Sequence, residues 1–252
     1  MAIYTFQLKV NGVDVSTLGF NVADFNQWDA PQLTYDEVAM PGQDGSTATT
    51  ATPLLQPLDF TVTGELIGSS PSDFESKLHT FKQALSLATL TLIGGNQTTL
   101  QRTAVYTGPM KVEPYATMDA AKITFTVRCR NPLQYDTTLT TVSGAAASAV
   151  TCVLGTYWSR PIISLATCSN PTLTYANASG TTVATLTVTA TGTMVIDCSA
   201  MTVTVNGADA PTAITLGDFF KLDPRDGVYG STSPTIAAST GSLSATYRKS
   251  YL

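Results

Sequence analysis

The amino-acid sequence predicts a mainly β protein made of two domains, a β domain that carries one helix and a second domain built as a β-sandwich or jelly-roll. Three observations lead to this prediction. Segments in which apolar and polar residues alternate recur along the chain, as in half-buried strands. Only 12% of the 252 residues are charged, and threonine, which favours strands and can face solvent without a charge, is abundant. One segment alone has helical periodicity.

The first domain begins with a β-hairpin. Residues alternate over Tyr4–Val10 and again over Val13–Val15, and the Asn11-Gly12 dipeptide between them suits a two-residue turn. The pattern is weaker from Gly19 to Pro53. Further strands are predicted at Leu58–Leu66, Thr99–Val112 and Thr117–Arg130.

A helix is predicted over residues 72–88. Ser72 and Glu75 have the spacing of a capping box, and Asp73 and Lys77 have that of an i,i+4 ion pair. The apolar residues form a single stripe: Phe74, Leu78, Phe81, Leu85 and Ala88. We expect this stripe to pack on the sheet of the same domain. The one histidine, His79, lies off the stripe, where we expect a solvated side chain.

The segment Phe125–Asp136 separates the two domains. It begins as an alternating strand, and Asn131-Pro132 then ends the strand because proline lacks a backbone donor and restricts the preceding residue. Leu133 and Tyr135 follow as an apolar anchor. We therefore predict domains at 1–136 and 137–252, joined by a short, stiff junction that contains Asn131, Pro132, Leu133 and Tyr135.

Short strand-like segments separated by turn residues fill the second domain. The predicted strands are Ala149–Leu154, Pro161–Thr167, Thr172–Ala176, Thr182–Ala190, Thr193–Cys198, Met201–Asn206, Phe219–Leu222, Thr235–Ala238 and Leu243–Arg248. Asn206-Gly207 is a second candidate for a tight hairpin turn. Many short strands at this spacing, without a helical stripe, predict a β-sandwich or jelly-roll.

The stretch Pro41–Pro53 is predicted to be a long exposed loop, because glycine and small polar residues dominate it. A phosphate cradle is disfavoured, since no P-loop lysine and no helix follow. Two interpretations stay open, a solvated loop and an arm that reaches a neighbouring subunit. Gly42, Asp44 and Gly45 are the candidates for the second.

The charge is distributed unevenly. Residues 1–136 contain 8 Lys and Arg against 13 Asp and Glu, a difference of −5, whereas residues 137–252 contain 5 of each. A basic nucleic-acid-binding patch is therefore not expected. The start of the chain reads as a strand and no apolar run has membrane-spanning length, so we expect a protein made in a cytoplasm and no membrane partner.

No catalytic constellation is recognisable, and we predict neither enzymatic activity nor a cofactor or metal. Cys129, Cys152, Cys168 and Cys198 are too widely spaced for a typical zinc site and are expected to be buried thiols. Asp218, Asp223 and Asp226 could form a glycosidase pair, but a Pro-bearing turn is the simpler interpretation. Tyr157 and Trp158 could stack on a sugar or, equally, anchor a strand entry.

The order of these parts resembles the distal tail protein family, Dit, of long-tailed bacteriophages. The resemblance is carried by the Pro132–Asp136 segment (PLQYD) at the domain junction and by the Val195–Gly207 hairpin, which follow the N-terminal hairpin, the PGQDG loop and the capped helix in the family's order. It spans the whole chain.

The resemblance implies a split-barrel-like N-terminal domain and a galectin-like C-terminal sandwich. Dit proteins form a hexameric ring that joins the tail tube to the tail-tip hub and helps to carry receptor-binding proteins, so the implied partners are further copies of this chain, the tube protein, the hub protein, and possible contacts with receptor-binding and tape measure proteins. The implied location is the virion tail tip. An acidic N-terminal domain would repel DNA in the channel of such a ring. The alternative is a free-standing carbohydrate-binding or adhesin module.

Overall fold

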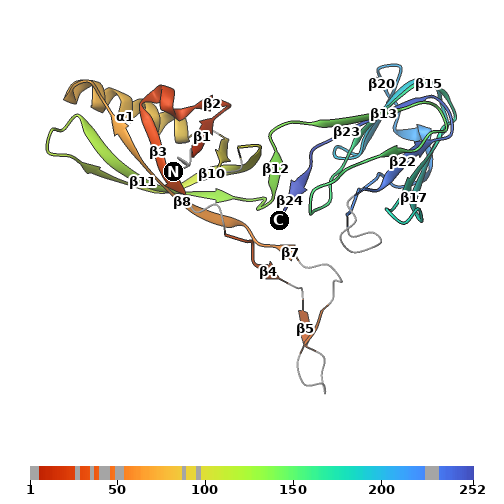
Figure 1. Ribbon diagram of the computed structural model, residues 1–252, viewed down its shortest axis with the longest axis horizontal. Helices are drawn as coiled ribbons and strands as arrows, with labels where there is room; N and C mark the ends of the chain where they lie inside the picture. The colour runs from red at the N-terminus through yellow and green to blue at the C-terminus, as the bar shows by residue number, and fades with distance from the viewer. Residues whose placement is uncertain are drawn as a thin grey trace. The chain divides into compact units, whose positions relative to one another are not determined.

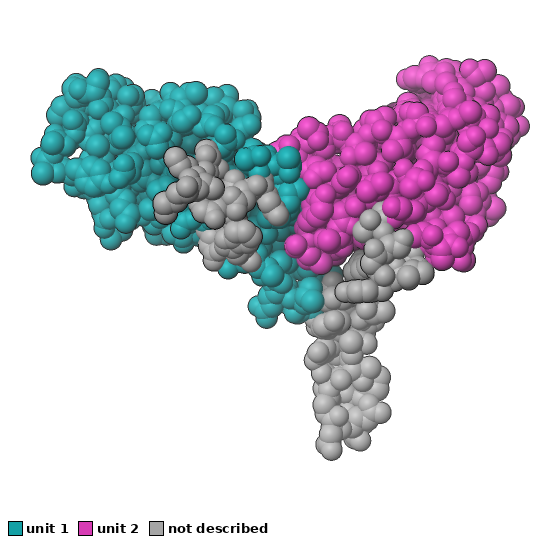
Figure 2. All heavy atoms as spheres, viewed as in Figure 1, with its two compact units in different colours: residues 1–134 teal, residues 135–252 magenta. Residues whose placement is uncertain are grey.

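A computed structural model describes residues 6–25, 29–34, 37–39, 46–48, 54–86, 89–94, 98–224 and 233–252. The chain divides into two compact units, Met1–Gln134 and Tyr135–Leu252 (Figure 2). This division lies two residues before the position that the sequence pattern suggested. Each unit has its own buried core.

Unit 1 contains one large antiparallel sheet (Figure 1). Along this sheet the strands run in the order β2-β1-β9-β10-β11-β8-β3. Their bounds are β1 Gln7–Val10, β2 Val13–Asp14, β3 Phe20–Phe25, β8 Leu58–Ile67, β9 Leu90–Ile93, β10 Leu100–Pro114 and β11 Ala120–Cys129. A short 3₁₀ helix, η1 (Val15–Leu18), precedes β3.

The predicted N-terminal hairpin is confirmed. Val10 pairs with Val13, and the two residues between them, Asn11 and Gly12, have φ values of 49° and 83°. Positive φ at both central positions is the geometry that matches the twist of the flanking strands, and asparagine and glycine adopt it with least strain.

Two short strand pairs lie within residues 33–55, and we call these two pairs together the hairpin of residues 33–55. Strand β4 (Leu33–Thr34) pairs with β7 (Leu54–Leu55), and β5 (Glu37–Ala39) pairs with β6 (Ser46–Ala48). The prediction of a loop over all of Pro41–Pro53 is therefore wrong at Ser46–Ala48, where threonine and small residues pair as a strand. Small polar residues look like a loop in the sequence, but a partner strand supplies the hydrogen bonds that the pattern cannot reveal.

The helix, α1, spans Pro71–Ser86. It begins one residue earlier than predicted, and its N-cap is Ser70 rather than Ser72: Ser70 Oγ accepts a hydrogen bond from Asp73 N at 3.3 Å, and Pro71 takes the first helical position. Asp73 also accepts from Ser69 N at 2.7 Å, and its predicted ion pair with Lys77 is present at 3.0 Å. Leu87 and Ala88 lie outside the described residues.

The helix packs on the sheet through aromatic rings. Phe81 stacks on Phe20 with ring centroids 4.6 Å apart and meets Phe125 edge-on at 5.9 Å. Gly64 is required beside this cluster, because a Cβ atom there would collide with the ring of Phe20. Phe74 and Leu85, two further members of the predicted stripe, are also buried.

Unit 2 is a sandwich of two antiparallel sheets. The first has the order β13-β23-β15-β18-β19-β20 and the second the order β14-β22-β16-β17-β21. Their bounds are β13 Thr140–Gly144, β14 Val150–Thr151, β15 Ile162–Ser169, β16 Thr172–Ala176, β17 Thr182–Val188, β18 Thr191–Asp197, β19 Thr202–Val205, β20 Ala208–Asp209, β21 Ile214–Gly217, β22 Thr235–Ala238 and β23 Ser242–Tyr247. A 3₁₀ turn, η2 (Pro211–Ala213), precedes β21, and β12 (Gln134–Asp136) pairs with β24 (Ser250–Tyr251).

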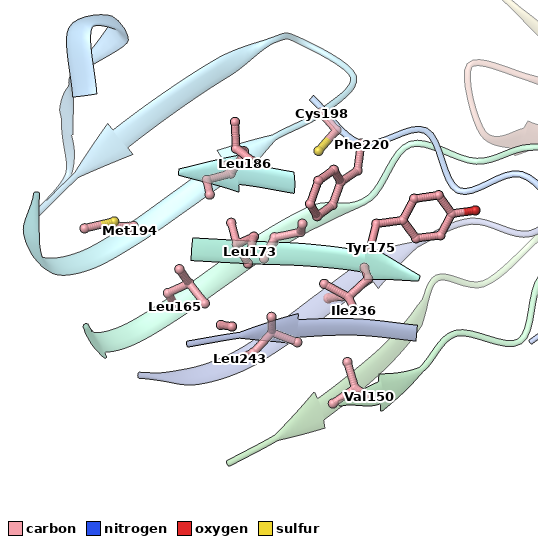
Figure 3. Packing of buried hydrophobic residues seen from close by; sticks show 14 of the residues in the cluster. Val150, Leu165, Leu173, Tyr175, Leu186, Met194, Cys198, Phe220, Ile236 and Leu243 are labelled. Carbon is pink, nitrogen blue, oxygen red and sulfur yellow. The ribbon is translucent and has the colours of Figure 1, made fainter. Parts of the chain in front are cut away.

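The two sheets of unit 2 enclose one apolar core. In Figure 3 the labelled side chains of Leu165, Leu173, Tyr175, Ile236 and Leu243 project into the space between the sheets, and all five are almost fully buried. The predicted strand at Phe219–Leu222 is wrong. That segment makes only an isolated bridge, Leu222 with Ser159, while its buried Phe220 ring fills the core.

The mainly β fold class, with one helix in the first unit, is confirmed. The Asn206-Gly207 turn between β19 and β20 is also as predicted, with φ values of 51° and 82°. The strands that were not predicted include β3, β13 and β21; β13 carries little apolar alternation, because its residues other than Val142 are small or polar.

Phe81→Ala is expected to destabilise unit 1 by about 3–5 kcal/mol, because it removes the ring that joins the helix to the sheet and leaves a cavity. Urea unfolding, monitored by amide hydrogen exchange, measures the free energy of unfolding of each unit separately. The matched control is Gln83→Ala, an exposed position on the same helix, where little change is expected. A change below about 1 kcal/mol for Phe81→Ala would show that the helix is held mainly by other contacts.

Candidate functional site

The solvent-exposed face of the neighbouring strands β10, β11, β8 and β3 is polar at its centre, and we call it the open face. Residues of the opposite face, such as Phe60, Val62 and Phe125, are buried. The centre of the open face consists of threonines paired across the strands, Thr61 with Thr126 and Thr63 with Thr124. Threonine supplies hydroxyl groups and high strand propensity without adding charge.

Ion pairs flank these threonines. Arg128 donates two hydrogen bonds to its cross-strand partner Asp59, from Nε to Oδ1 and from Nη2 to Oδ2, both at 2.7 Å. The guanidinium holds the pKa of Asp59 below its usual range. At the other end Lys122 lies opposite both Glu65 and Glu113.

The open face consequently holds little of the acidic excess of unit 1. On β3, β8, β10 and β11 its charged residues are the carboxylates Asp24, Asp59, Glu65 and Glu113 and the cations Lys111, Lys122 and Arg128, a difference of −1. Lys111 Nζ lies 2.5 Å from a Glu113 carboxylate oxygen. The acidic residues found in the sequence are thus mostly elsewhere, and three of the four on this face, Asp59, Glu65 and Glu113, have cationic neighbours.

A buried arginine that the sequence analysis missed lies beneath the junction. Arg102 is almost fully buried in β10, where its Nε donates to Pro132 O at 3.3 Å and its Nη2 donates to Asp29 O at 3.4 Å. Its guanidinium lies 5.1 Å from the centroid of the Phe60 ring, and burial lowers the pKa of Arg102. The sequence held a clue, since Arg102 falls in the apolar phase of its strand, between Leu100 and Ala104.

The predicted junction residues lie on either side of the division between the units. Leu133 N donates to Asn131 Oδ1 at 3.2 Å, a local turn that follows the end of β11. Leu133 is buried in unit 1, and Tyr135, the first residue of unit 2, is half-buried. Together with the Arg102 bond to Pro132, these contacts give residues 131–133 a defined conformation.

The sugar-contact candidates, Tyr157 and Trp158, are brought together in unit 2 with ring centroids 5.7 Å apart. Tyr157 is buried, and its N–H donates to Ser250 O at 3.0 Å, as expected for a packing anchor. The Trp158 ring has cationic groups beside it, with Lys221 Nζ at 5.1 Å and Arg160 Cζ at 5.8 Å from its centroid. A sugar that stacked there would meet these cations.

The remaining candidates for chemistry are not brought together. Asp223 is buried in a 3.5 Å ion pair with Lys221, whereas Asp218 is exposed, and Asp226 lies outside the described residues. Among the described residues no group of three or more His, Cys, Asp or Glu side chains could hold a metal ion. The described part of the chain also has no helix long and apolar enough to span a membrane.

All four cysteines are buried thiols without a disulfide. Burial raises the pKa of Cys129 and of Cys198 to about 11 and that of Cys152 to about 12. At neutral pH these groups are protonated and therefore poor nucleophiles.

The candidates for an inter-subunit loop, Gly42, Asp44 and Gly45, lie outside the described residues. The structure describes the strand pairs β4–β7 and β5–β6 on either side of this segment in the sequence. Next to the β4–β7 pair, Gln56 N donates to Gln32 O at 2.9 Å, and Gln56 Nε2 donates to Thr34 Oγ1 at 3.0 Å. These hydrogen bonds continue the pairing of the two segments beyond β4 and β7.

Arg102→Ala is expected to destabilise unit 1 by about 2–3 kcal/mol, because two backbone carbonyl groups lose a charged donor in a buried position. Urea unfolding measures the change, and faster hydrogen exchange around residues 129–134 would locate it. Arg102→Lys, which keeps the charge but loses the planar fork, should recover only part of the stability. Arg128→Ala, on the open face of the next strand, is the control. Equal effects of Arg102→Ala and Arg128→Ala would contradict the anchoring role.

Comparison with known proteins gives a family and a fold. Residues 154–251 match the family described as siphovirus-type tail component, C-terminal domain, SPP1_Dit. The chain is similar in structure to the Dit protein of phage SPP1, described as a paradigm of hub adsorption apparatus in phages infecting Gram-positive hosts, with a TM-score of 0.76 and 17% identity over 98% of this chain and 100% of that one.

A second similarity is to a chain of the phage P2 baseplate in its activated conformation with Ca, with a TM-score of 0.51 and 8% identity over 98% of each chain. No match was found among curated protein sequences. The family match lies entirely within unit 2, whereas the similarity to SPP1 Dit extends over both units. The resemblance to distal tail proteins is therefore confirmed: residues 154–251 match the model of the siphovirus-type tail component family, and the chain as a whole has the fold of SPP1 Dit.

Proposed function

We propose that this protein is a structural, non-catalytic component of a phage tail tip, in which six copies form a ring that joins the tail tube to the tail-tip hub protein and leaves a channel for DNA. The observation that carries the proposal is the similarity to SPP1 Dit, which covers 98% of this chain and 100% of that one. The family match of unit 2 to a siphovirus-type tail component supports it. In this proposal unit 1 builds the ring and unit 2 stands outside it, toward receptor-binding proteins.

The open face of unit 1 is suited to be the wall of such a channel. Proteins hold DNA through lysine and arginine side chains that neutralise phosphates. On the open face Arg128 is engaged by Asp59, Lys111 by Glu113, and Lys122 lies between two glutamates. A wall of threonines and paired ions would let DNA pass because it offers few free cations. Such a nearly neutral wall differs from the acidic wall that the charge of the N-terminal domain led us to expect.

The hairpin of residues 33–55 is suited to be the clasp between neighbouring copies. A two-stranded hairpin on its own is marginally stable in water. Its base also leaves two large apolar side chains in solvent, Leu33 at 50% and Leu54 at 52% exposed. Packing against a second copy would cover these leucines and support the ladder, and Gly42, Asp44 and Gly45 remain our candidates for the inter-subunit contact.

Ring formation is tested by native mass spectrometry and negative-stain imaging of the purified full-length protein, where a six-fold ring is expected. Replacing residues 37–48 by a short turn, which keeps β4 and β7, should abolish or strongly weaken the ring. Shortening the exposed Asn177–Thr181 turn of unit 2 is the control and should leave the ring intact. Rings that survive the loss of residues 37–48 would rule out the clasp. A strictly monomeric wild type would favour the free-standing sugar-binding alternative.

The double variant Leu133→Ala with Tyr135→Ala is expected to loosen unit 2 while the ring of unit 1 persists, because these residues are our candidates for setting the angle between the units. Class averages should retain the ring but lose sharp density for the outer unit. Leu139→Ala, at an exposed position in unit 2, is the control. Equally sharp outer density in the double variant and the control would contradict the role of the junction.

A further inference from the structure

The lysine and arginine residues of unit 2 come from three short segments of the sequence. They are Arg160, Lys221, Arg225, Arg248 and Lys249, of which Arg225 lies outside the described residues. Hydrogen bonds bring the three segments together, because Ser159 N donates to Leu222 O at 2.9 Å and Ser159 Oγ donates to Arg248 O at 2.6 Å. Cations that are far apart in the sequence are thereby concentrated at one end of the first sheet of unit 2.

Trp158 lies in the middle of these segments. Its carbonyl oxygen accepts a hydrogen bond from Ser250 Oγ at 2.6 Å, and its ring is half-buried. Lys221 and Arg160 both lie close to this ring, as described above, and cation–π contacts of this kind restrain long side chains that would otherwise move freely in solvent. We call Trp158, Arg160, Lys221 and Arg248 the cationic cluster.

The cationic cluster is only partly neutralised by carboxylates. Lys221 has an ion pair with Asp223, at 3.5 Å. Among the described residues, Arg160 and Arg248 have no carboxylate within ion-pair distance. The carboxylate of Asp197, which is close to Arg160 in the fold, accepts hydrogen bonds from two backbone N–H groups of its own turn, at 2.8 and 2.9 Å. The cluster therefore has positive charge available for an external anion.

A hollow lined by hydroxyl groups lies on the outer face of the same sheet. Its volume is about 470 Å³, and the described residues that line it are all uncharged. Serines from three neighbouring strands contribute to it: Ser143 of β13, Ser244 of β23 and Ser164 of β15. Hydroxyl groups both donate and accept hydrogen bonds, so this hollow is suited to a neutral ligand that is rich in hydroxyl groups.

The hollow and the cationic cluster belong to one surface. Two residues beyond the serines, Ile162 pairs with Thr246 on the outer face. Arg160 and Arg248 come two residues further along the same two segments, in the same alternation of exposed and buried positions. Each step of two residues covers about 6.6 Å along a strand, so the serines lie roughly 13 Å from the two arginines. A short chain of sugar units is long enough to contact both.

We infer that this surface of unit 2 binds a phosphorylated saccharide. A guanidinium group donates paired hydrogen bonds to phosphate oxygens, and a lysine supplies a further positive charge. A phosphate monoester carries nearly two negative charges at neutral pH, which several cations match better than they match one carboxylate. Trp158 offers apolar surface to the C–H groups of a sugar ring, and the serines offer hydrogen bonds to its hydroxyl groups.

This inference does not rest on the proposed ring, because every residue of the site belongs to unit 2. It also resolves the conflict at Trp158, where the cations beside the ring are unfavourable neighbours for a purely neutral sugar. With a phosphate on the saccharide, the same cations become part of the binding site.

The test is saturation-transfer difference NMR of the full-length protein with maltose 1-phosphate, read on the sugar protons. Wild type should bind it with a dissociation constant of about 1 mM, as a small exposed site allows. Neutral maltose should bind at least about tenfold more weakly, because it lacks the charge-assisted hydrogen bonds. Added salt should weaken binding of the phosphorylated sugar.

The double variant Arg160→Gln with Lys221→Gln removes both cations beside the ring and should weaken binding of maltose 1-phosphate at least about tenfold. Trp158→Ala should reduce the transfer to the sugar protons. Lys9→Gln with Lys82→Gln is the matched control, because it removes the same charge from unit 1 and should bind as wild type does. Thermal unfolding checks that each variant is folded, and Lys221→Gln alone, at an exposed position, replaces the double variant if that one is not.

The inference is supported if the cluster variants lose binding while the control keeps it. Four results would overturn it: maltose that binds as tightly as its phosphate, inorganic phosphate that binds as tightly as maltose 1-phosphate, an acidic peptide that binds more tightly than either, or no transfer from wild type at about 10 mM ligand. A failure of the proposed ring is distinguishable from these, since native mass spectrometry decides ring assembly and the cluster variants decide the binding site.

Discussion

A sheet must bury one face, and in unit 1 this requirement governs the rest of the structure. The described part of unit 1 contains one α-helix, and it covers the sheet through Phe81, which lies between Phe20 and Phe125. The other face of β8 and β11 is then left to solvent. Its composition is constrained in turn, because an exposed apolar face would aggregate and an exposed cationic face would hold nucleic acid. Threonines and cross-strand ion pairs satisfy both constraints.

The low charge content of the chain acquires a structural meaning from these pairings. Charged residues are few, and most of those on the open face have an oppositely charged neighbour, as Arg128 has in Asp59. Surface ion pairs of this kind contribute little to stability. Their effect is to neutralise the surface locally, which suits a protein that we propose to surround moving DNA.

Unit 2 solves the burial problem differently, since its two sheets cover each other. Its core needs no helix, and its cysteines contribute as small apolar side chains with pKa values raised by burial. The similarity to SPP1 Dit at 17% identity is understandable on this basis. Alternation of buried and exposed residues can be maintained by many different side chains, so a fold of this kind tolerates extensive substitution while its volume and pattern are kept.

The sequence by itself determined the structural features that depend on interactions between residues close together in the chain. The Asn-Gly turns, the long strand β8, the strands β16 and β22 and the apolar stripe of the helix all follow from local periodicity and backbone preference. The order of these parts also sufficed to suggest the family. The helix cap was misplaced by two residues because Ser70 and Ser72 are both plausible caps, and Pro71 decides between them only through its fixed φ.

Only the tertiary structure decided the features that depend on partners distant in sequence. Asp59 and Arg128 are 69 residues apart, and the strand register alone brings them together. Arg102 could be recognised as an exception to its apolar strand phase, but its acceptors, Pro132 and Asp29, could not. The same holds for β6 and β13, whose small and polar residues become strands because a neighbouring strand completes their hydrogen bonds.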